Sequence, residues 1–196
     1  MYILIVSVSI FSVIFFNLLA DFSWTMALNL LIGFAIVLLP SLFIALIIRV
    51  LPSKWFDPNL KIYRVSDKER KFLVKIGIKK WKDKIPEAGK LVNFKKDKIE
   101  KPNDVEYLNK FLKEMCYGEC LHICCIISSL IGMCFMPNGC FWNISFVIAM
   151  IYSLLNVPSI LIQRYNRPRF QAYVERLKKV SNPAPELQQT QEVKDC

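Results

Sequence analysis

The sequence predicts an all-α integral membrane protein with four transmembrane helices in two hairpins, and with cytoplasmic amphipathic interfacial helices between the hairpins. Of its 196 residues, 54% are hydrophobic, and they gather in long runs rather than in the periodic patterns of a soluble domain. The formal net charge of +10 lies mainly in the middle segment and in the residues from Arg164 onwards, whereas the two short turns within the hairpins are nearly uncharged. Because cytoplasmic segments of membrane proteins carry an excess of lysine and arginine, we expect a multi-pass protein of the cell membrane with both termini cytoplasmic.

Residues 1–51 form the predicted N-terminal transmembrane hairpin. Residues 1–20 consist almost entirely of Ile, Val, Phe, Leu and Ser. A helix of ~20 residues is long enough to cross the hydrocarbon core of a bilayer. The run lacks the basic start and the small-residue cleavage site of a signal peptide, so we expect it to be retained. After a turn at residues 21–24, a second helix is predicted over residues 25–48, with a kink at Pro40.

Residues 52–118 form a basic segment that is expected to lie at the cytoplasmic surface. Ser66 and Glu69 have the spacing of a capping box, which predicts the start of a helix that ends at Gly77. Beyond Gly77, apolar side chains recur at helical spacing among lysines, which is typical of a short helix in the headgroup layer. The apolar positions are Ile78, Trp81 and Ile85, and the lysines are Lys79, Lys80, Lys82 and Lys84. This helix either anchors the segment or forms a basic floor in which Trp81 and Lys82 contact a substrate.

A further helix is predicted to start at Asn103, because Glu106 follows three residues later. Its apolar positions Leu108, Phe111, Leu112 and Met115 keep a period of 3.6, so this stretch is expected to lie along the membrane surface. It leads into the second hairpin, which we place within residues 119–180. The third span is predicted over residues 120–136 and the fourth over residues 141–162, with a turn between them. Residues 181–196 are rich in Pro and Gln and are expected to be disordered.

Several classes of function are excluded or disfavoured by composition. The seven cysteines are odd in number and form no CxxC pair, and the single histidine is too few for the usual zinc sites, so neither a disulfide framework nor a metal is expected. Five of these cysteines lie in or beside one apolar run, where packing between helices is the default interpretation and palmitoylation of Cys116 is an alternative. No nucleic-acid-binding motif accompanies the basic residues, so the expected partners are the lipid bilayer or a phosphorylated ligand.

The end of the last apolar run carries an unusual group of polar side chains. Asn156-Val157-Pro158 is followed by the string Gln163-Arg164-Tyr165-Asn166-Arg167-Pro168-Arg169. One interpretation is a positive-inside anchor at the foot of a membrane helix. The other is a binding site, since the planar guanidinium fork of arginine suits phosphate or carboxylate better than lysine does.

These strings carry a resemblance to a known family. Together with Lys80-Trp81-Lys82-Asp83-Lys84-Ile85 and with Glu119 and His122, they resemble the glycosyl-4,4'-diaponeurosporenoate acyltransferase family over roughly residues 55–176. That family is associated with the last step of staphyloxanthin-type carotenoid synthesis. The resemblance implies a membrane-bound O-acyltransferase that moves a fatty acyl group to a hydroxyl of a glycosylated carotenoid or a similar amphiphilic lipid. The acyl donor would be acyl-CoA or an acyl carrier protein, and no other cofactor is expected.

Acyl transfer to a hydroxyl needs a base, donors that stabilise the oxyanion, and a grip on the donor's carrier. His122 is the only histidine and suits the role of general base. Glu119 lies three residues earlier on the same predicted helix, so the two are interpreted as a catalytic pair. The substrate-binding residues are then expected to be Asn156, Arg164, Tyr165, Asn166, Arg167 and Arg169, together with Trp81 and Lys82.

Two alternatives stay open at this point. The chain could be a non-enzymatic small membrane protein whose basic cytoplasmic face binds anionic lipid or a partner. It could also be an acyltransferase for a different glycolipid or amphiphilic alcohol. In the non-enzymatic case Glu119 and His122 would only mark where the third helix leaves the membrane.

Overall fold

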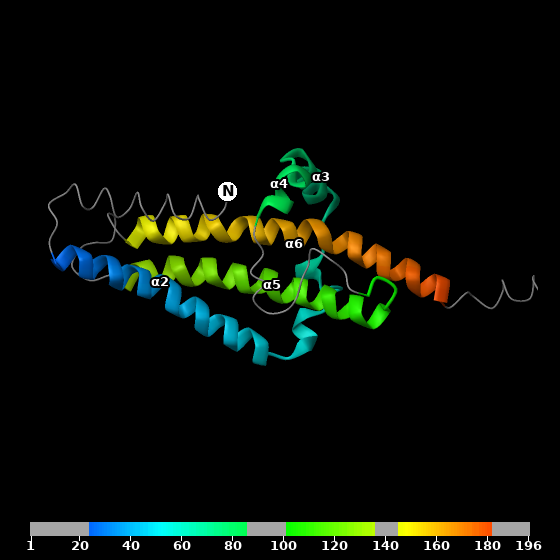
Figure 1. The fold of residues 1–196 in the computed structure, drawn as a ribbon, viewed down its shortest axis with the longest axis horizontal. Helices are drawn as coiled ribbons and strands as arrows, with labels where there is room; N and C mark the ends of the chain where they lie inside the picture. The colour runs from blue at the N-terminus through cyan, green and yellow to red at the C-terminus, as the bar shows by residue number, and fades with distance from the viewer. Residues whose placement is uncertain (1–23, 86–100, 136–144, 182–196) are drawn as a thin grey trace, which may run out of the picture.

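The computed structural model describes residues 24–85, 101–135 and 145–181, and every element within these ranges is helical (Figure 1). The helices and 3₁₀ turns in chain order are α2 (Trp24–Val50), η1 (Ser53–Phe56), η2 (Lys61–Tyr63), α3 (Asp67–Lys75), α4 (Ile78–Trp81), η3 (Lys82–Lys84), α5 (Val105–Gly132), η5 (Met133–Phe135) and α6 (Phe146–Ser181).

Three of these helices are long and apolar enough to cross a membrane. The candidate spans are Ala27–Val50, Val105–Phe135 and Phe146–Val180. They correspond to the second, third and fourth predicted spans, and α2 agrees with its predicted bounds to within two residues. The predicted first helix, the two turns within the hairpins and the C-terminal tail lie outside the described residues.

Helices α5 and α6 run antiparallel and side by side along most of their length (Figure 1). The contacts between them fix the register from one end to the other. Phe111 packs on Phe170 with ring centroids 4.8 Å apart, and Ser129 hydrogen bonds to Ser153 over 3.0 Å. At the other end, the hydroxyl of Ser145 donates to the carbonyl oxygen of Met133 over 3.0 Å. Small polar side chains of this kind are typical of helix interfaces within membranes.

Helix α2 packs against both of the other long helices. Its buried Val37 lies in a cluster with Ile148 and Ala149 of α6. Towards α5 the approach is close, since a Cβ added to Gly132 would lie 3.0 Å from Cγ2 and 3.1 Å from the carbonyl oxygen of Ile36. Pro40 has no amide hydrogen to donate to that carbonyl, yet α2 runs through Pro40 as one helix.

The predicted end of the fourth helix at residue 162 is wrong. Helix α6 continues to Ser181, through both Pro158 and Pro168. Its last turns bury Val174 against a cluster on the first half of α5, which supplies the packing that keeps this charged part helical. The arginine string therefore lies within a helix and not at its foot.

The helix that was predicted to start at Asn103 begins one residue later than expected. Asp104, not Asn103, caps α5, and its carboxylate accepts hydrogen bonds from the amides of Glu106 and Tyr107 at 2.9 and 3.0 Å. The amphipathic stretch and the predicted third span form one continuous helix, α5. The four apolar side chains of the amphipathic stretch are buried against α6, where they form the cluster around Val174.

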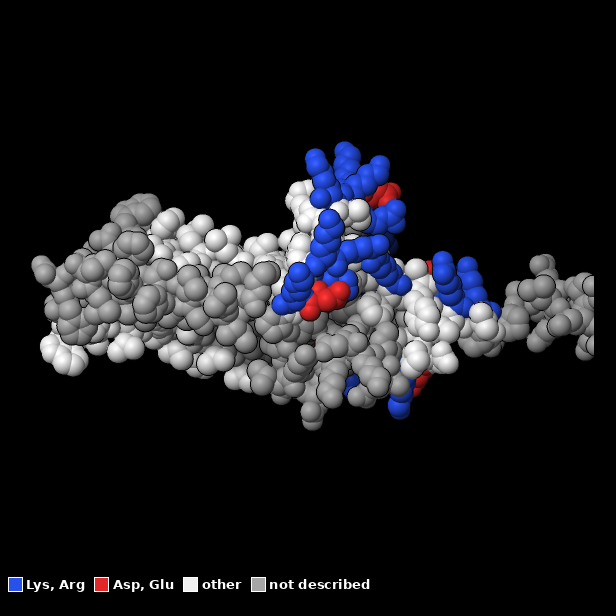
Figure 2. Space-filling view, turned by 45° about the horizontal axis from the view of Figure 1, so that its top comes forward, with Lys and Arg blue, Asp and Glu red and all other residues white. Residues whose placement is uncertain are grey.

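Helices α3 and α4 form a small unit beside α6 (Figure 1). Together with η2, which precedes them, and η3, which follows, they make up residues 61–84, which we call the basic lobe. Ser66 caps α3 as predicted, accepting from the Glu69 amide over 3.2 Å, and Gly77 separates α3 from α4 with a φ of 67°. Leu73 and Ile78 are buried against Ile162 and Tyr165 of α6. The apolar side of the lobe thus covers the protein's own helix, whereas its lysine and arginine side chains gather on the surface (Figure 2).

Candidate functional site

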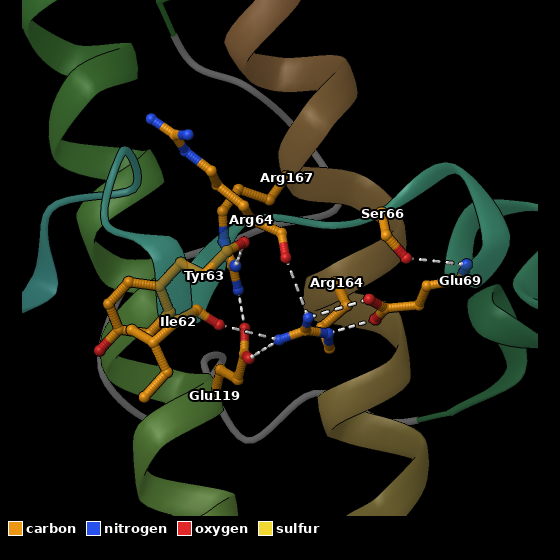
Figure 3. A network of polar contacts seen from close by, with 8 residues as sticks. All are labelled: Ile62, Tyr63, Arg64, Ser66, Glu69, Glu119, Arg164 and Arg167. Atoms are coloured by element: carbon orange, nitrogen blue, oxygen red, sulfur yellow. Dashed lines mark hydrogen bonds and ion pairs between the residues drawn. The ribbon is translucent and has the colours of Figure 1, made fainter.

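A cluster of charges that is buried at its centre joins the basic lobe to α5 and α6 (Figure 3). Its centre is Glu119 of α5, which is 1% exposed. One carboxylate oxygen accepts a hydrogen bond from Nη1 of Arg164 over 2.6 Å, and the other accepts from Nη2 of Arg167. Both arginines come from α6 and lie one turn apart, so they approach the same carboxylate. We call Glu69, Glu119, Arg164 and Arg167 the charged cluster.

Arg164 also binds the lobe. Its Nε and Nη2 form a bidentate pair with the carboxylate of Glu69, with Nη2 3.0 Å from Oε2. The same guanidinium donates to the backbone carbonyls of Ile62 over 3.3 Å and of Arg64 over 3.1 Å. A lysine could not reproduce this fork of contacts, because it presents a single point charge.

Arg167 is fully buried on the other side of Glu119. Its Nη1 donates to the carbonyl oxygen of Tyr63 over 2.5 Å, and its guanidinium lies 5.1 Å from the centre of the Tyr63 ring. Burial of an unpaired guanidinium would cost several kcal/mol, so Glu119 is the partner that makes this position tolerable.

The charged cluster has no net charge, because its two carboxylates neutralise its two guanidiniums. The hydrogen bond from Arg164 holds the pKa of the Glu69 carboxyl below its ordinary value; partial burial acts in the opposite direction, and the Ser66 backbone adds to the lowering. For Tyr63, burial raises the pKa of the phenol, so it stays neutral beside the cluster.

His122 lies one helical turn beyond Glu119, about 4.5 Å further along the axis of α5. Its Nδ1 is 2.8 Å from Oδ1 of Asn156 on α6. The amide nitrogen of Asn156 donates to the carbonyl oxygen of Tyr152 over 2.8 Å, and the Tyr152 hydroxyl donates to Ser41 of α2 over 2.8 Å. His122 is half-buried and Asn156 is buried, so the pair lies between spanning helices next to the charged cluster.

The structure therefore brings together five of the predicted site residues, namely Glu119, His122, Asn156, Arg164 and Arg167, in a different pairing. Glu119 and His122 share a face of α5 as expected, but both carboxylate oxygens of Glu119 bind arginines, and Nδ1 of His122 binds Asn156. Arg164 and Arg167, expected to grip phosphates, bind carboxylates and backbone carbonyls of the protein itself.

The other predicted residues lie around this centre. Tyr165 is buried beneath Arg169, whose guanidinium is exposed and 3.9 Å from the Tyr165 ring centre. Asn166 is half-buried on α6. On the lobe, the indole of Trp81 donates to the carbonyl oxygen of Ile76 over 3.2 Å, and Lys82 pairs with Asp83 over 2.8 Å. Trp81 and Tyr165 border the same apolar cluster between the lobe and α6.

Sequence reasoning missed three side chains that complete the arrangement. Glu69 was interpreted only as part of a capping box, although it is one of few acidic residues in a lysine-rich segment. Tyr152 and Ser41 were not singled out, although a polar side chain within an apolar span is a signal for a buried partner. In the part of the chain that the structure describes, no group of three or more His, Cys, Asp or Glu side chains could hold a metal ion.

The chain was compared with protein families, with curated proteins and with solved structures. Neither the curated proteins nor the solved structures give a match. The model of one family, CrtO, described as glycosyl-4,4'-diaponeurosporenoate acyltransferase, matches residues 52–176, which is more than half of the chain. The matched range contains the basic lobe, the charged cluster and the pair formed by His122 and Asn156. This protein is thus a member of the glycosyl-4,4'-diaponeurosporenoate acyltransferase family.

Proposed function

We propose that this protein is a membrane-bound O-acyltransferase that moves a fatty acyl group from an activated thioester to a hydroxyl of a glycosylated carotenoid or a similar membrane lipid. The observation that carries the proposal is the family match over residues 52–176. Three helices of spanning length support it, because a bundle embedded in lipid can receive an amphiphilic acceptor directly from the bilayer.

In this reaction His122 acts as general base. It takes the proton of the acceptor hydroxyl while the oxygen attacks the thioester carbonyl, so that the C–O bond forms and the C–S bond breaks. The imidazolium then returns its proton to the leaving thiolate, which departs as a free thiol. A half-buried histidine held by a hydrogen bond between two spanning helices supports this role, since ionisable groups in such places are rarely kept without function.

The charged cluster has a positioning part in the proposed reaction. Arg164 and Arg167 hold Glu119 and fasten the basic lobe beside the turn of α5 that carries His122. Exposed Arg169, with the lysines of the lobe, would then attract the phosphates of acyl-CoA or of an acyl carrier protein. The side chains of Trp81 and Lys82 belong to this outer, donor-facing surface in the proposal.

The test is an acyl-transfer assay in membranes that contain the full chain. A glucosylated carotenoid ester serves as acceptor, acyl-CoA and acyl carrier protein are compared as donors, and the product is identified by mass spectrometry. The wild-type protein should give the acylated glycolipid, and His122→Ala should lower turnover by ~10²-fold or more, the usual worth of a general base. If His122→Ala keeps near-normal turnover at a matched protein level, His122 is not the general base.

A second candidate function is favoured by the lysine and arginine side chains that gather on the lobe (Figure 2). A non-enzymatic protein would use this face to bind anionic headgroups or an acidic partner. It would tolerate His122→Ala, but it would lose binding to anionic vesicles when Lys79 and Lys80 are replaced by Gln. If acyl transfer is observed and requires His122, the protein is an acyltransferase and not a non-enzymatic binding protein.

A further inference from the structure

The chemistry of a neutral His122 depends on which of its two ring nitrogens carries the hydrogen. A neutral imidazole carries one proton, on either Nδ1 or Nε2, and the partner of one nitrogen decides which tautomer is present. The partner of Nδ1 here is the side-chain amide of Asn156, which has both a donor and an acceptor end. The orientation of that amide therefore decides the chemistry of His122.

The contacts of Asn156 fix the orientation. Its amide nitrogen lies 2.8 Å from the carbonyl oxygen of Tyr152, one turn earlier on α6. In the reversed orientation two acceptor oxygens would face each other at that distance, which is repulsive. The amide oxygen of Asn156 must consequently point at Nδ1 of His122, 2.8 Å away. An oxygen acceptor at Nδ1 requires a proton on Nδ1.

We propose that Asn156 is the positioning residue for His122: it keeps the imidazole proton on Nδ1, so that the basic lone pair of the neutral ring lies on Nε2. This rests on the proposed function, in which His122 is the base. The spacing of Glu119 and His122 favours Glu119 for the supporting role, but the arginines occupy both of its oxygens. A neutral amide in that role also avoids placing a second carboxylate within the spanning part of the bundle.

The side chain of Asn156 is hydrogen-bonded to His122 of α5 and to the backbone of Tyr152 on its own helix, α6. It is buried, and its acceptor Tyr152 is tied through its hydroxyl to Ser41 of α2. Ser41 in turn donates to the carbonyl oxygen of Val37. The polar contacts that begin at His122 and Asn156 thus continue through Tyr152 into α2.

The experiment exploits the single histidine of the chain. The full-length protein is labelled with ¹⁵N-histidine and reconstituted in lipid bilayers, where nitrogen chemical shifts distinguish protonated from unprotonated ring nitrogens. At a pH where the ring is neutral, the wild type should show a protonated Nδ1 and an unprotonated Nε2. A protonated Nε2 in the wild type overturns the inference, whatever the activity of the enzyme.

Three variants separate positioning from packing. Asn156→Leu removes the acceptor and should shift the proton largely to Nε2, with kcat lowered about tenfold to a hundredfold and KM little changed. Asn156→Asp retains an oxygen at Nδ1 and should keep the wild-type tautomer. Ser153→Ala is the control, because it removes a hydrogen bond between the same two helices without touching His122, and it should leave the spectrum unchanged.

The outcomes distinguish the inference from the function on which it rests. If the wild-type tautomer persists in Asn156→Leu, Asn156 does not position the ring and the inference fails. If the tautomer changes as expected but His122→Ala retains turnover, the proposed base is wrong while the hydrogen-bond assignment stands.

Discussion

Glu119 is a buried carboxylate that Arg164 and Arg167 share as their acceptor. Glu119→Gln keeps the shape but leaves Arg167 buried without its counter-charge. We expect a loss of about 3–5 kcal/mol in the free energy of unfolding, the usual cost of breaking a buried pair. Thermal unfolding in detergent measures it.

The matched control is Glu114→Gln on the same helix. Glu114 pairs with Arg49 over 2.7 Å, but the two side chains are 20% and 52% exposed. A pair exposed in this way is worth about 0–1 kcal/mol, so the control should be nearly neutral. Equal losses in the two variants would contradict the central place given to Glu119.

Arg164 allows two explanations of its role to be compared. Its guanidinium binds two carboxylates and two backbone carbonyls at once, so Arg164→Lys should loosen the basic lobe. We expect faster tryptic cleavage within residues 61–84 and reduced acyl transfer together. Arg169→Lys, at an exposed position, should leave proteolysis unchanged. If Arg164→Lys raised only the KM for the donor, with normal proteolysis, a phosphate-binding role would be favoured instead.

The carboxyl group of Glu69 gives the stability a dependence on pH. Because the pKa of Glu69 is lowered in the folded protein, its contribution is present in full above the unfolded pKa of about 4.5. That contribution is lost as the pH falls through the lower, folded pKa. The difference in melting temperature between wild type and Glu69→Gln should therefore be constant at neutral pH and shrink below about pH 4.5. A difference that grows on acidification would contradict the assignment.

At the scale of elements, Gly77 determines how α4 follows α3. Its φ of 67° lies in the left-handed region, which a residue with a Cβ enters at a cost of roughly 1–2 kcal/mol. Gly77→Ala should lower the melting temperature and expose the lobe to protease, whereas Gly77→Asn should cost less, because Asn tolerates this region. The space around Gly77 is open, with the nearest atom 3.9 Å from an added Cβ, so a steric clash does not confuse the comparison.

The elements that the sequence predicted well are those defined by local chemistry. The cap at Ser66, the break at Gly77 and the apolar run of α2 each depend on a few neighbouring residues. The end of α6 was misplaced because the loss of hydrophobicity after Ile162 was interpreted as the end of the helix. That part of α6 is instead held by Phe111 and its neighbours on α5, a contact between distant parts of the chain.

In the candidate site, too, local sequence predicts which residues are involved but not which of them pair. Composition, spacing and the family resemblance singled out His122, Glu119, Arg164 and Arg167 as candidates, since charged and ionisable side chains stand out beside apolar spans. Which of them pair depends on the register of α5 against α6, and no local pattern encodes that register. The contribution of Glu69 was hidden for the same reason, since its partner Arg164 lies 95 residues away.

For the molecule as a whole, four spans with both termini cytoplasmic remains a prediction. It rests on the excess of basic residues in residues 52–118 and after Arg164, against the nearly uncharged turns. A reporter fused after Lys96 or at the C-terminus should be found on the cytoplasmic side. A reporter after Lys96 outside the cell would reverse the orientation and place the basic lobe away from any cytoplasmic thioester.

The 36 residues of α6 correspond to about 54 Å of helix, well beyond a hydrocarbon layer of about 30 Å. Contacts from Ser145 to Val174 lock this helix to its neighbours, so a thicker or thinner bilayer would tilt the bundle rather than slide one helix along another. The position of His122 along the bundle is then fixed relative to all of α6, whatever the tilt. For the proposed acyltransferase we therefore expect a preference for acceptors whose hydroxyl lies at the level of His122 along the bundle.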